Sequence, residues 1–252
     1  MSEASVAARA LALLDLTDLT EDASEAGLSS LCTRAVAAPS PVAAICIWPR
    51  FVRQARALLG DGPVRIATVV NFPEGGTAIA PVLRETEQAL TEGADEIDLV
   101  LPWQAFLAGY LESPRAMVRL VKLRCGDKRL KVILETGEYP DLAQVQAAAE
   151  LAIAEGADFI KTSTGKTVHS ASIPAARTML QVIGATKRPV GLKPSGGIRS
   201  LSDAASYLAL ADAIMGPDWA TPETFRFGAS GLHQVLVDVI AGGAAGQANG
   251  PY

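Results

Sequence analysis

Short apolar segments alternate with helical segments along almost all of this 252-residue chain. The apolar segments are rich in β-branched residues and are bounded by Gly, Pro or Asp, which is typical of strands. Eight strands are predicted, at 13–17, 43–48, 64–70, 96–102, 130–135, 159–163, 189–194 and 225–230. Helices are predicted at 23–37, 50–59, 80–91, 113–125, 140–155, 174–185, 202–210 and 231–241. Such alternation indicates parallel strands joined by helical crossovers.

The number of these units and the chain length predict the α/β class and a single-domain (β/α)8 TIM barrel. The tetrapeptide Glu-Gly-Ala-Asp occurs at 92–95 and again at 155–158, each time between a helix and a strand, which indicates a repeated unit. A doubly wound open sheet is the alternative, but its first strand usually leads into a Gly-rich turn, and here the glycines come late. We expect a barrel domain at 1–243 and a mobile, Gly- and Ala-rich tail at 244–252.

Composition narrows the class of partner. The chain has 49% hydrophobic and 19% charged residues and a net charge of −5, with its basic residues scattered. We therefore expect small-molecule substrates and neither nucleic acid nor membrane as a partner. The three cysteines, Cys32, Cys46 and Cys125, show no paired spacing, and no basic and apolar leader is apparent. These features predict a cytoplasmic protein.

The segment 158–167, Asp-Phe-Ile-Lys-Thr-Ser-Thr-Gly-Lys-Thr, carries a lysine inside a predicted strand. Because side chains alternate along a strand, Lys161 points to the opposite face from Ile160. Taken alone, this lysine fits an exposed edge strand as well as it fits a reactive group. The Gly-Lys-Thr ending is not a nucleotide-binding P-loop, because that motif needs glycine where Ile160 stands.

The same alternation places three charged side chains inside the predicted barrel. Ile97 and Leu99 face outward, which leaves Asp98 inside, and in the next-to-last strand the inward residue is Lys193. Lys161 and Lys193 lie on consecutive strands, so we expect the two lysines to be close to each other. One carboxylate and two ammonium groups would then share a small enclosed volume.

This arrangement predicts amine chemistry. A neighbouring cation and desolvation both disfavour a second ammonium, so one lysine can lose its proton and attack a carbonyl to form a Schiff base. Asp98 and Lys193 would then transfer protons, through water. The alternative is an ordinary buried salt bridge between Asp98 and Lys193, with Lys161 as a bystander.

Metal chemistry is not expected, since His169 and His233 are far apart in the sequence and lie outside the strands. We predict no metal and no cofactor. Cys46 faces inward by the same alternation, although a small buried thiol is the commoner explanation for it.

A second cluster is predicted to hold a phosphate. TIM barrels often bind phosphate with the loops after strands seven and eight and a helix N-terminus. Here those loops are rich in Gly and Ser, and the Gly-Lys pair after strand six would close the cup. The candidate substrate and phosphate ligands are Thr162, Gly165, Lys166, Gly196, Gly197, Arg199, Gly228 and Ser230.

The chain resembles the deoxyribose-phosphate aldolase family of class I, metal-free aldolases. The resemblance runs through LLDLTDL, AAICIWPRF, RIATVVNFPEG, EGADEIDLV, LKVILETGE, GADFIKTSTGK, GLKPSGGIR and RFGAS, of which GADFIKTSTGK is the most specific. It implies reversible cleavage of 2-deoxy-D-ribose 5-phosphate to D-glyceraldehyde 3-phosphate and acetaldehyde. A homodimer is the expected assembly.

The resemblance also implies residue roles. It places the Schiff base on Lys161, proton transfer on Asp98 and Lys193, and polar support on Asp15 and Cys46. Some relatives bring a C-terminal tyrosine to the site, and this chain ends in Tyr252. Two departures concern the surroundings of the site: Gly231 stands where relatives often have a second serine, and Ser195 replaces a frequent alanine.

Three other functions stay open at this point. One is a different Schiff-base enzyme, such as a transaldolase or another sugar-phosphate aldolase. A sugar-phosphate isomerase would use Asp98 as its base and the lysines to bind an anion. The third is a catalytically inactive phosphosugar-binding protein.

Overall fold

The computed structural model describes residues 2–244 and 246–247, and within these the chain forms one ring of eight parallel strands. The strands are β1 (Leu14–Asp18), β2 (Ala44–Ile47), β3 (Arg65–Val70), β4 (Glu96–Val100), β5 (Arg129–Ile133), β6 (Phe159–Lys161), β7 (Gly191–Lys193) and β8 (Phe227–Ala229). They pair in the order β7-β6-β5-β4-β3-β2-β1-β8. Parallel bridges from Leu192 to Phe225 and from Ser195 to Gly228 join the two ends of this order. The predicted (β/α)8 barrel is confirmed.

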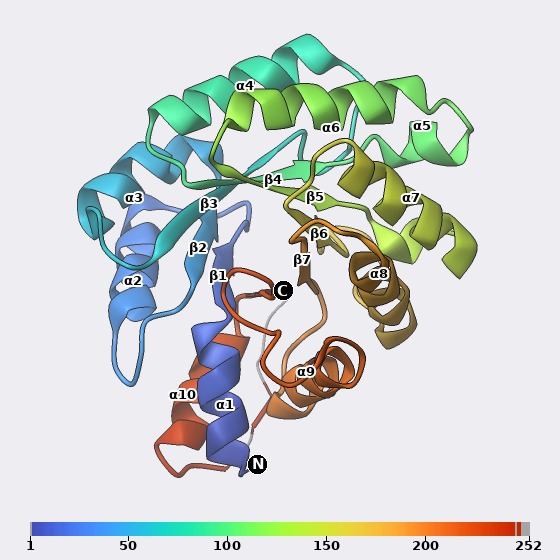
Figure 1. Cartoon of the computed structure of the whole chain (residues 1–252). Coiled ribbons are helices and arrows are strands. Elements are labelled where there is room, and N and C mark those ends of the chain that lie inside the picture. Colours follow the sequence, from blue (N-terminus) through green and yellow to red (C-terminus); the bar gives the residue numbers. More distant parts are fainter. Residues whose placement is uncertain (1, 245, 248–252) are drawn as a thin grey trace.

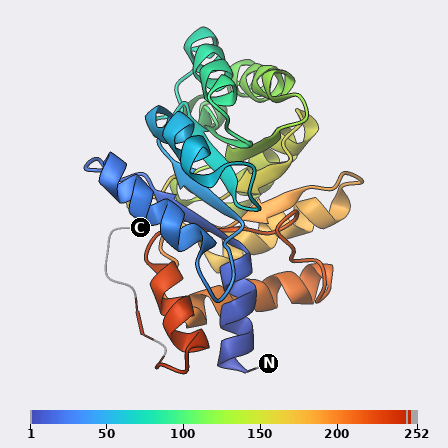
Figure 2. The same cartoon turned by 90° about the vertical axis from the view of Figure 1, so that its left-hand side faces the viewer.

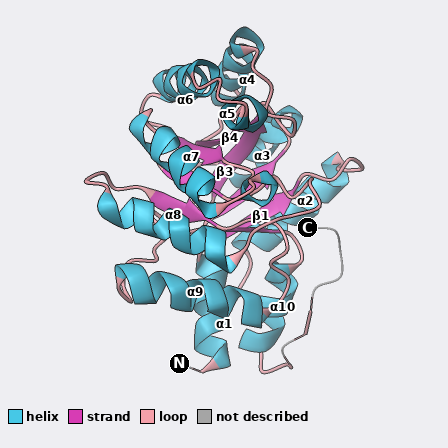
Figure 3. Ribbon diagram, turned by 90° about the vertical axis from the view of Figure 1, so that its right-hand side faces the viewer, coloured by secondary structure: helices cyan, strands magenta, loops and turns pink. Residues whose placement is uncertain are grey.

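Helices surround the strands on the outside (Figures 1 and 3). They are α1 (Glu3–Ala12), α2 (Glu25–Val36), α3 (Val52–Leu59), α4 (Ile79–Thr91), α5 (Trp103–Leu107), α6 (Glu112–Cys125), α7 (Leu142–Ala154), α8 (Ile173–Ala185), α9 (Leu201–Met215) and α10 (Leu232–Ile240). Short 3-10 turns lie at Pro49–Phe51 and Thr136–Glu138. Among the described helices, none is both long enough and apolar enough to cross a membrane.

Side-chain alternation divides the strands into two faces. The outward residues, such as Ile97, Leu99 and Ile160, join one large apolar core between the strands and the helices. The inward face is different, because a small apolar group of Leu19, Cys46, Ala67 and Val69 occupies only part of it. Another part of the interior is charged, and this part contains the candidate site.

The two copies of the Glu-Gly-Ala-Asp sequence have the same local structure. Gly93 and Gly156 both have positive φ, 108° and 114°, where glycine avoids the steric cost that other residues bear. Each following aspartate then accepts a backbone N–H from the preceding strand: Asp95 from Ile66 at 3.0 Å, and Asp158 from Leu130 at 2.8 Å. The repeat therefore ends a helix and ties the next strand to its neighbour, as the predicted repeated unit requires.

Two helices were missing from the sequence-based prediction. Helix α1 precedes the first strand and lies beside α10, as seen in blue and red in Figure 2, and its Arg9 binds Asp212 of α9 with two hydrogen bonds of 2.6 and 2.7 Å. The five-residue α5 is too short for a helical period to be seen in the sequence.

Element boundaries also differ from the predictions. Strands β6, β7 and β8 have only three residues each, shorter than predicted, and α9 continues to Met215. Pro189 and Pro194 flank β7, and proline has no N–H to donate to a strand ladder. Of the predicted mobile tail, residue 245 and residues 248–252, including Tyr252, lie outside the described residues. Gln247 is described and pairs with Ser200.

Candidate active site

Asp98 of β4 lies at the centre of the charged barrel interior and binds lysines from three neighbouring strands. Its Oδ2 accepts from Lys161 Nζ at 3.0 Å and from Lys193 Nζ at 2.7 Å. Its Oδ1 accepts from Lys131 Nζ at 2.9 Å. Asp98 and Lys193 are fully buried, and Lys161 is 1% exposed. The predicted proximity of Asp98, Lys161 and Lys193 is confirmed, and none of them lies on an exposed edge strand.

Strand register explains this proximity. Lys161 and Lys193 are direct partners across the β6–β7 pair, so their Cα atoms lie side by side and both side chains enter the barrel. Asp98 and Lys131 are partners across β4–β5 in the same way. Across β5–β6, Lys131 pairs with Phe159 and Lys161 pairs with Ile133, so the Lys161–Lys193 pair lies one inward residue further along the strands than the Asp98–Lys131 pair.

Neighbouring charges hold both Lys193 and Asp98 in their ionised forms. Burial opposes the charge of Lys193, but the nearby carboxylates of Asp15 and Asp98 outweigh it and raise the pKa of Lys193 well above the ordinary lysine value. Burial likewise opposes the charge of Asp98, but Lys131, Lys193 and Lys161 together bring the pKa of Asp98 well below its usual value. Lys193 is therefore a fixed cation that shares a carboxylate oxygen with Lys161.

The structure also brings Asp15 and Cys46 to this cluster. Asp15 Oδ2 lies 2.6 Å from Lys193 Nζ, and its Oδ1 accepts from Arg226 at 2.6 Å. Cys46 Sγ lies 3.9 Å from Asp98 Oδ2, as a weak donor. Burial raises the pKa of the Cys46 thiol, which keeps the sulfur protonated.

Sequence reasoning missed three residues of the same cluster, Glu96, Lys131 and Arg226. Lys131 Nζ lies 2.5 Å from Glu96 Oε2, and Arg226 Nη2 lies 2.9 Å from Glu96 Oε1. The signal that would have found them is the alternation that found Asp98. Glu96 is two residues before Asp98, and Lys131 and Arg226 are each flanked by apolar outward residues.

The glycine-rich loops after β6 and β7 meet at the same end of the barrel. A Cβ on Gly196 would lie 3.4 Å from Gly165 Cα and 2.8 Å from Ser170 Oγ, so only glycine permits this approach. Gly165, Gly196 and Gly197 all have positive φ, between 78° and 84°. The loops after β6 and β7, which the sequence predicted to bind phosphate together, are therefore neighbours.

The other predicted ligands take varied positions. Thr162 bridges to the next loop, because its hydroxyl donates to the Ser195 carbonyl at 3.1 Å and accepts the Ser195 N–H at 2.9 Å. Lys166 Nζ donates to the Leu19 carbonyl at 2.7 Å, which links the loops after β6 and β1. Ser230 directly precedes Gly231, the N-cap residue of α10.

Arg199 lies at the N-terminus of α9, and Gly228 lies next to the Lys193 side chain. The Arg199 backbone N–H donates to Asp203, whose carboxylate caps α9 together with Ser200. A Cβ on Gly228 would lie 2.2 Å from Ser195 Oγ and 3.1 Å from Lys193 Cε. Gly228 therefore leaves room for the Lys193 side chain.

Glu135, at the end of β5, is a further residue that sequence reasoning did not select. It adopts a left-handed backbone with φ 62°, which is rare for a residue with a side chain. Its two carboxylate oxygens accept the Thr164 N–H at 3.1 and 3.3 Å, so it anchors the loop that carries Gly165 and Lys166. Burial raises the pKa of Glu135.

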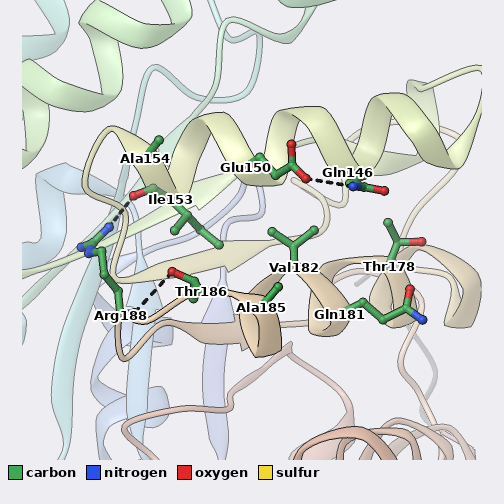
Figure 4. Close-up of a pocket in the computed structure, with 10 residues that line it drawn as sticks. All are labelled: Gln146, Glu150, Ile153, Ala154, Thr178, Gln181, Val182, Ala185, Thr186 and Arg188. Atoms are coloured by element: carbon green, nitrogen blue, oxygen red, sulfur yellow. Dashed lines mark hydrogen bonds between the residues drawn. The ribbon is translucent and has the colours of Figure 1, made fainter.

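A separate hollow lies on the outside of the barrel, between α7 and α8 (Figure 4). Its polar groups bind one another: Gln146 donates to Glu150 at 2.8 Å, and Arg188 donates to the Ile153 carbonyl. Its lining contains none of the buried lysines or carboxylates described above. The charged barrel interior is therefore the candidate active site.

Comparison with known proteins identifies the family of this chain. A family model described as DeoC/LacD family aldolase matches residues 9–234. The deoxyribose-phosphate aldolase of Agrobacterium fabrum is 53% identical over 248 residues, which cover 98% of this chain and 96% of that protein.

Solved structures show the same similarity. A deoxyribose phosphate aldolase from Aeropyrum pernix, described as tetrameric, is 25% identical with a TM-score of 0.75, over 94% of this chain and 92% of that one. A structure from Toxoplasma gondii, provisionally assigned the same enzyme name, has a TM-score of 0.87 at 25% identity, over 96% of this chain and 98% of that one. On this evidence the chain belongs to the DeoC/LacD family of aldolases.

Proposed function

We propose that the protein reversibly cleaves 2-deoxy-D-ribose 5-phosphate into D-glyceraldehyde 3-phosphate and acetaldehyde, through a Schiff base on Lys161. The observation that supports this most strongly is the shared oxygen: Lys161 and Lys193 both bind Asp98 Oδ2 inside a closed barrel. Because Lys193 is held as a cation, Lys161 is the lysine of this pair that we assign as the nucleophile.

In the cleavage direction, the Lys161 amine attacks C1 of the open-chain sugar, and loss of water gives a protonated Schiff base. The C2–C3 bond then breaks. Its electron pair moves toward the iminium to form an enamine, while the C3 hydroxyl loses its proton and becomes the aldehyde of glyceraldehyde 3-phosphate. Protonation of the enamine at C2 and hydrolysis release acetaldehyde and the free amine. In the synthetic direction the same steps run in reverse.

Asp98 and Lys193 are the groups placed to move these protons. Asp98 contacts the Lys161 amine directly, and Lys193 shares the same carboxylate oxygen, so a proton can pass among them with one intervening water. Asp15 supports Lys193 from the other side, at 2.6 Å. Cys46 contributes an uncharged thiol to the wall of the site.

The substrate phosphate is proposed to bind at the glycine-rich rim. The N-terminus of α10 carries no side-chain cap, so its N–H groups are suited to an anion. The N-terminus of α9 differs, because the Ser200 and Asp203 side chains already cap it. We therefore assign the phosphate to Ser230 and the start of α10, with Gly197 and Gly165 contributing backbone N–H groups and Lys166 contributing charge.

Covalent trapping tests the assignment. Incubation with acetaldehyde and a borohydride reductant is expected to modify Lys161, as located by mass spectrometry of peptides. Lys161→Ala is expected to abolish both the adduct and turnover, by more than about 1,000-fold, since the covalent step has no replacement. Lys187→Ala, at an exposed lysine, is the control and is expected to behave as the native protein.

The outcomes separate the competing functions. Turnover without any adduct would favour a sugar-phosphate isomerase and would contradict the Schiff-base proposal. An adduct with no release of acetaldehyde from deoxyribose 5-phosphate would favour a different Schiff-base aldolase or a transaldolase. An adduct with no turnover of any sugar phosphate would indicate a binding protein.

We also propose a cytoplasmic location and a homo-oligomer. Cys32, Cys46 and Cys125 are buried free thiols, which suits a reducing compartment. The sequence-based homodimer remains a prediction, and the tetrameric Aeropyrum pernix relative supports self-association more generally. Light scattering on the purified protein measures the assembly directly.

A further inference from the structure

A second tier of charges lies beneath the candidate nucleophile, toward the N-terminal ends of the strands. Its central contact joins Glu96 of β4 to Arg226, with Arg226 Nη2 at 2.9 Å from Glu96 Oε1. Arg226 also donates to Asp15 at 2.6 Å, and Glu96 lies 2.5 Å from Lys131. Because Asp15 binds Lys193 and Lys131 binds Asp98, the Glu96–Arg226 pair is linked to the site on both sides.

Six members of this network are ionisable side chains, of which three are carboxylates and three are cations. Burial opposes ionisation of all of them, but their partners lower the pKa of the three carboxylates and raise the pKa of the three cations. The carboxylates are Asp15, Glu96 and Asp98, and the cations are Lys131, Lys193 and Arg226. All six have at most 2% of their side chains exposed. The charge of these six groups therefore sums to zero.

Lys161 is the one remaining lysine of the described barrel interior, and its protonation would add a positive charge to this balanced set. A net charge in a poorly polarisable interior costs free energy, whereas a balanced set does not. Arg129 also binds Glu96, at 2.8 Å, but it is 27% exposed and lines an open hollow at the N-terminal end of the barrel. Water therefore screens its charge.

Two other titratable groups approach Lys161, and neither belongs to the network of the Glu96–Arg226 pair. Burial raises the pKa of Cys46, so it stays a neutral thiol. Burial raises the pKa of Glu135, whereas the hydrogen bonds from Thr164 and the charge of Lys161 act in the opposite direction.

We propose that Glu96 and Arg226 are positioning residues that set the charge of the enclosed network, and that their balance keeps the Lys161 amine neutral and reactive. The inference rests on the proposed function, because it assigns a cause to the reactivity of the proposed nucleophile. It extends control of Lys161 from its direct neighbours to a pair that does not touch it. The pair acts through Lys131 and Asp98 on one side, and through Asp15 and Lys193 on the other.

The proposal predicts opposite effects for the two members of the pair. In a plot of the rate of adduct formation at Lys161 against pH, the acid limb is the range in which the rate rises with pH. Glu96→Gln leaves an excess positive charge, so this limb is expected to move to lower pH. Arg226→Met leaves an excess negative charge that a protonated Lys161 would balance, so the acid limb is expected to move to higher pH. A shift of roughly one pH unit is expected in each case, which is equivalent to a change of about tenfold in the rate of adduct formation at a pH on the acid limb.

The readout is the rate of adduct formation at Lys161 with acetaldehyde and cyanoborohydride across pH, each variant divided by the native protein at the same pH. The double variant Glu96→Gln/Arg226→Met restores the balance, and its acid limb is expected to return close to the native position. Arg226→Lys keeps the charge and is expected to leave the limb in place. Arg9→Met, which removes a paired arginine between α1 and α9, is the control for loss of stability alone.

A merely structural role would lower the rate of every variant without moving the limb, and the double variant would then be worse than either single one. Shifts in the same direction for Glu96→Gln and Arg226→Met would likewise overturn the inference. If Arg226→Met does not fold, Glu96→Gln alone decides the matter, because it is isosteric and its limb must move to lower pH. An absence of any Lys161 adduct in the native protein would instead overturn the proposed function.

Discussion

Gly228 makes room for the side chain of Lys193. The space that a Cβ would fill at this position is taken by Ser195 Oγ, 2.2 Å away, and by Lys193 Cε, 3.1 Å away. A residue that looks like part of a phosphate loop in the sequence thus also shapes the interior next to the proposed nucleophile. Single atoms matter here because closely packed interiors have no spare volume.

Gly228→Ala is therefore expected to displace Lys193 and to reduce kcat at least about tenfold, with a loss of stability of roughly 1–3 kcal/mol from overpacking. Steady-state kinetics and thermal unfolding measure the two effects. Adding Ser195→Gly removes the nearer clash and is expected to restore part of the activity. Native-like kinetics of Gly228→Ala would contradict the packing argument.

Lys193 is expected to matter through its charge as well as its position. Lys193→Met keeps most of the side-chain volume but removes the cation beside Asp98, so Lys161 becomes the cation that pairs with this carboxylate. Turnover at pH 7 is expected to fall at least about 100-fold, as for loss of a proton-transfer group. The trapping rate of this variant should recover as the pH is raised. A deficit that stays constant with pH would contradict a charge effect.

At the scale of elements, the end of β5 and the loop after β6 form one unit. Glu135, with its left-handed backbone, accepts the Thr164 N–H and, at 3.5 Å, the Thr167 hydroxyl. Strain of this kind persists only where surrounding contacts hold it in place. The carboxylate thereby positions the loop that carries Gly165 and Lys166.

Glu135→Ala is expected to raise KM for the phosphorylated substrate about tenfold or more, while the rate of acetaldehyde trapping at Lys161 changes little. The stability cost should be roughly 1–3 kcal/mol, the range for removing a buried hydrogen-bond partner. Glu135→Gln retains one acceptor oxygen and is expected to be milder. Glu135→Gly relieves the positive φ, so a result equal to that of alanine would show that the lost carboxylate, and not backbone strain, causes the effect. An unchanged KM in all three variants would contradict the anchoring role.

The whole molecule contains an acid-sensitive interior. The pKa values of Asp15, Glu96 and Asp98 are depressed in the folded barrel, so the folded state binds fewer protons than the unfolded state in acid. This contribution to stability is present above the unfolded carboxylate pKa, near 4, and is lost as the pH falls toward the folded values.

The melting temperature is therefore expected to fall steadily below about pH 5, by about 2–4 °C for each kcal/mol lost. Calorimetry between pH 7 and pH 3 measures this. Asp98→Asn removes one of the depressed carboxylates and should show a shallower dependence, even though it is less stable at pH 7. A melting temperature independent of pH over this range would contradict the ionised network.

The sequence by itself determined the barrel and the position of the lysine proposed as its nucleophile. Eight alternating units allow few other closed arrangements, and the two-residue period of a strand decides which face Asp98, Lys161 and Lys193 take. Short elements were harder to predict. Helix α5 shows no period, and the ends of β6 to β8 depend on where the strand ladder stops, which is a property of the neighbouring strands.

Only the tertiary structure decided which charges balance which. Glu96, Lys131 and Arg226 face the barrel interior, as Asp98 does, and side-chain alternation predicts this face. Alternation does not predict that Arg226 reaches both Asp15 and Glu96, which are far apart in the chain. The reason is physical: the strength of a buried charge interaction depends on distance and enclosure, and both are set by strand register around a closed ring. Sequence alternation fixes the face of each side chain, and closure of the barrel fixes its partners.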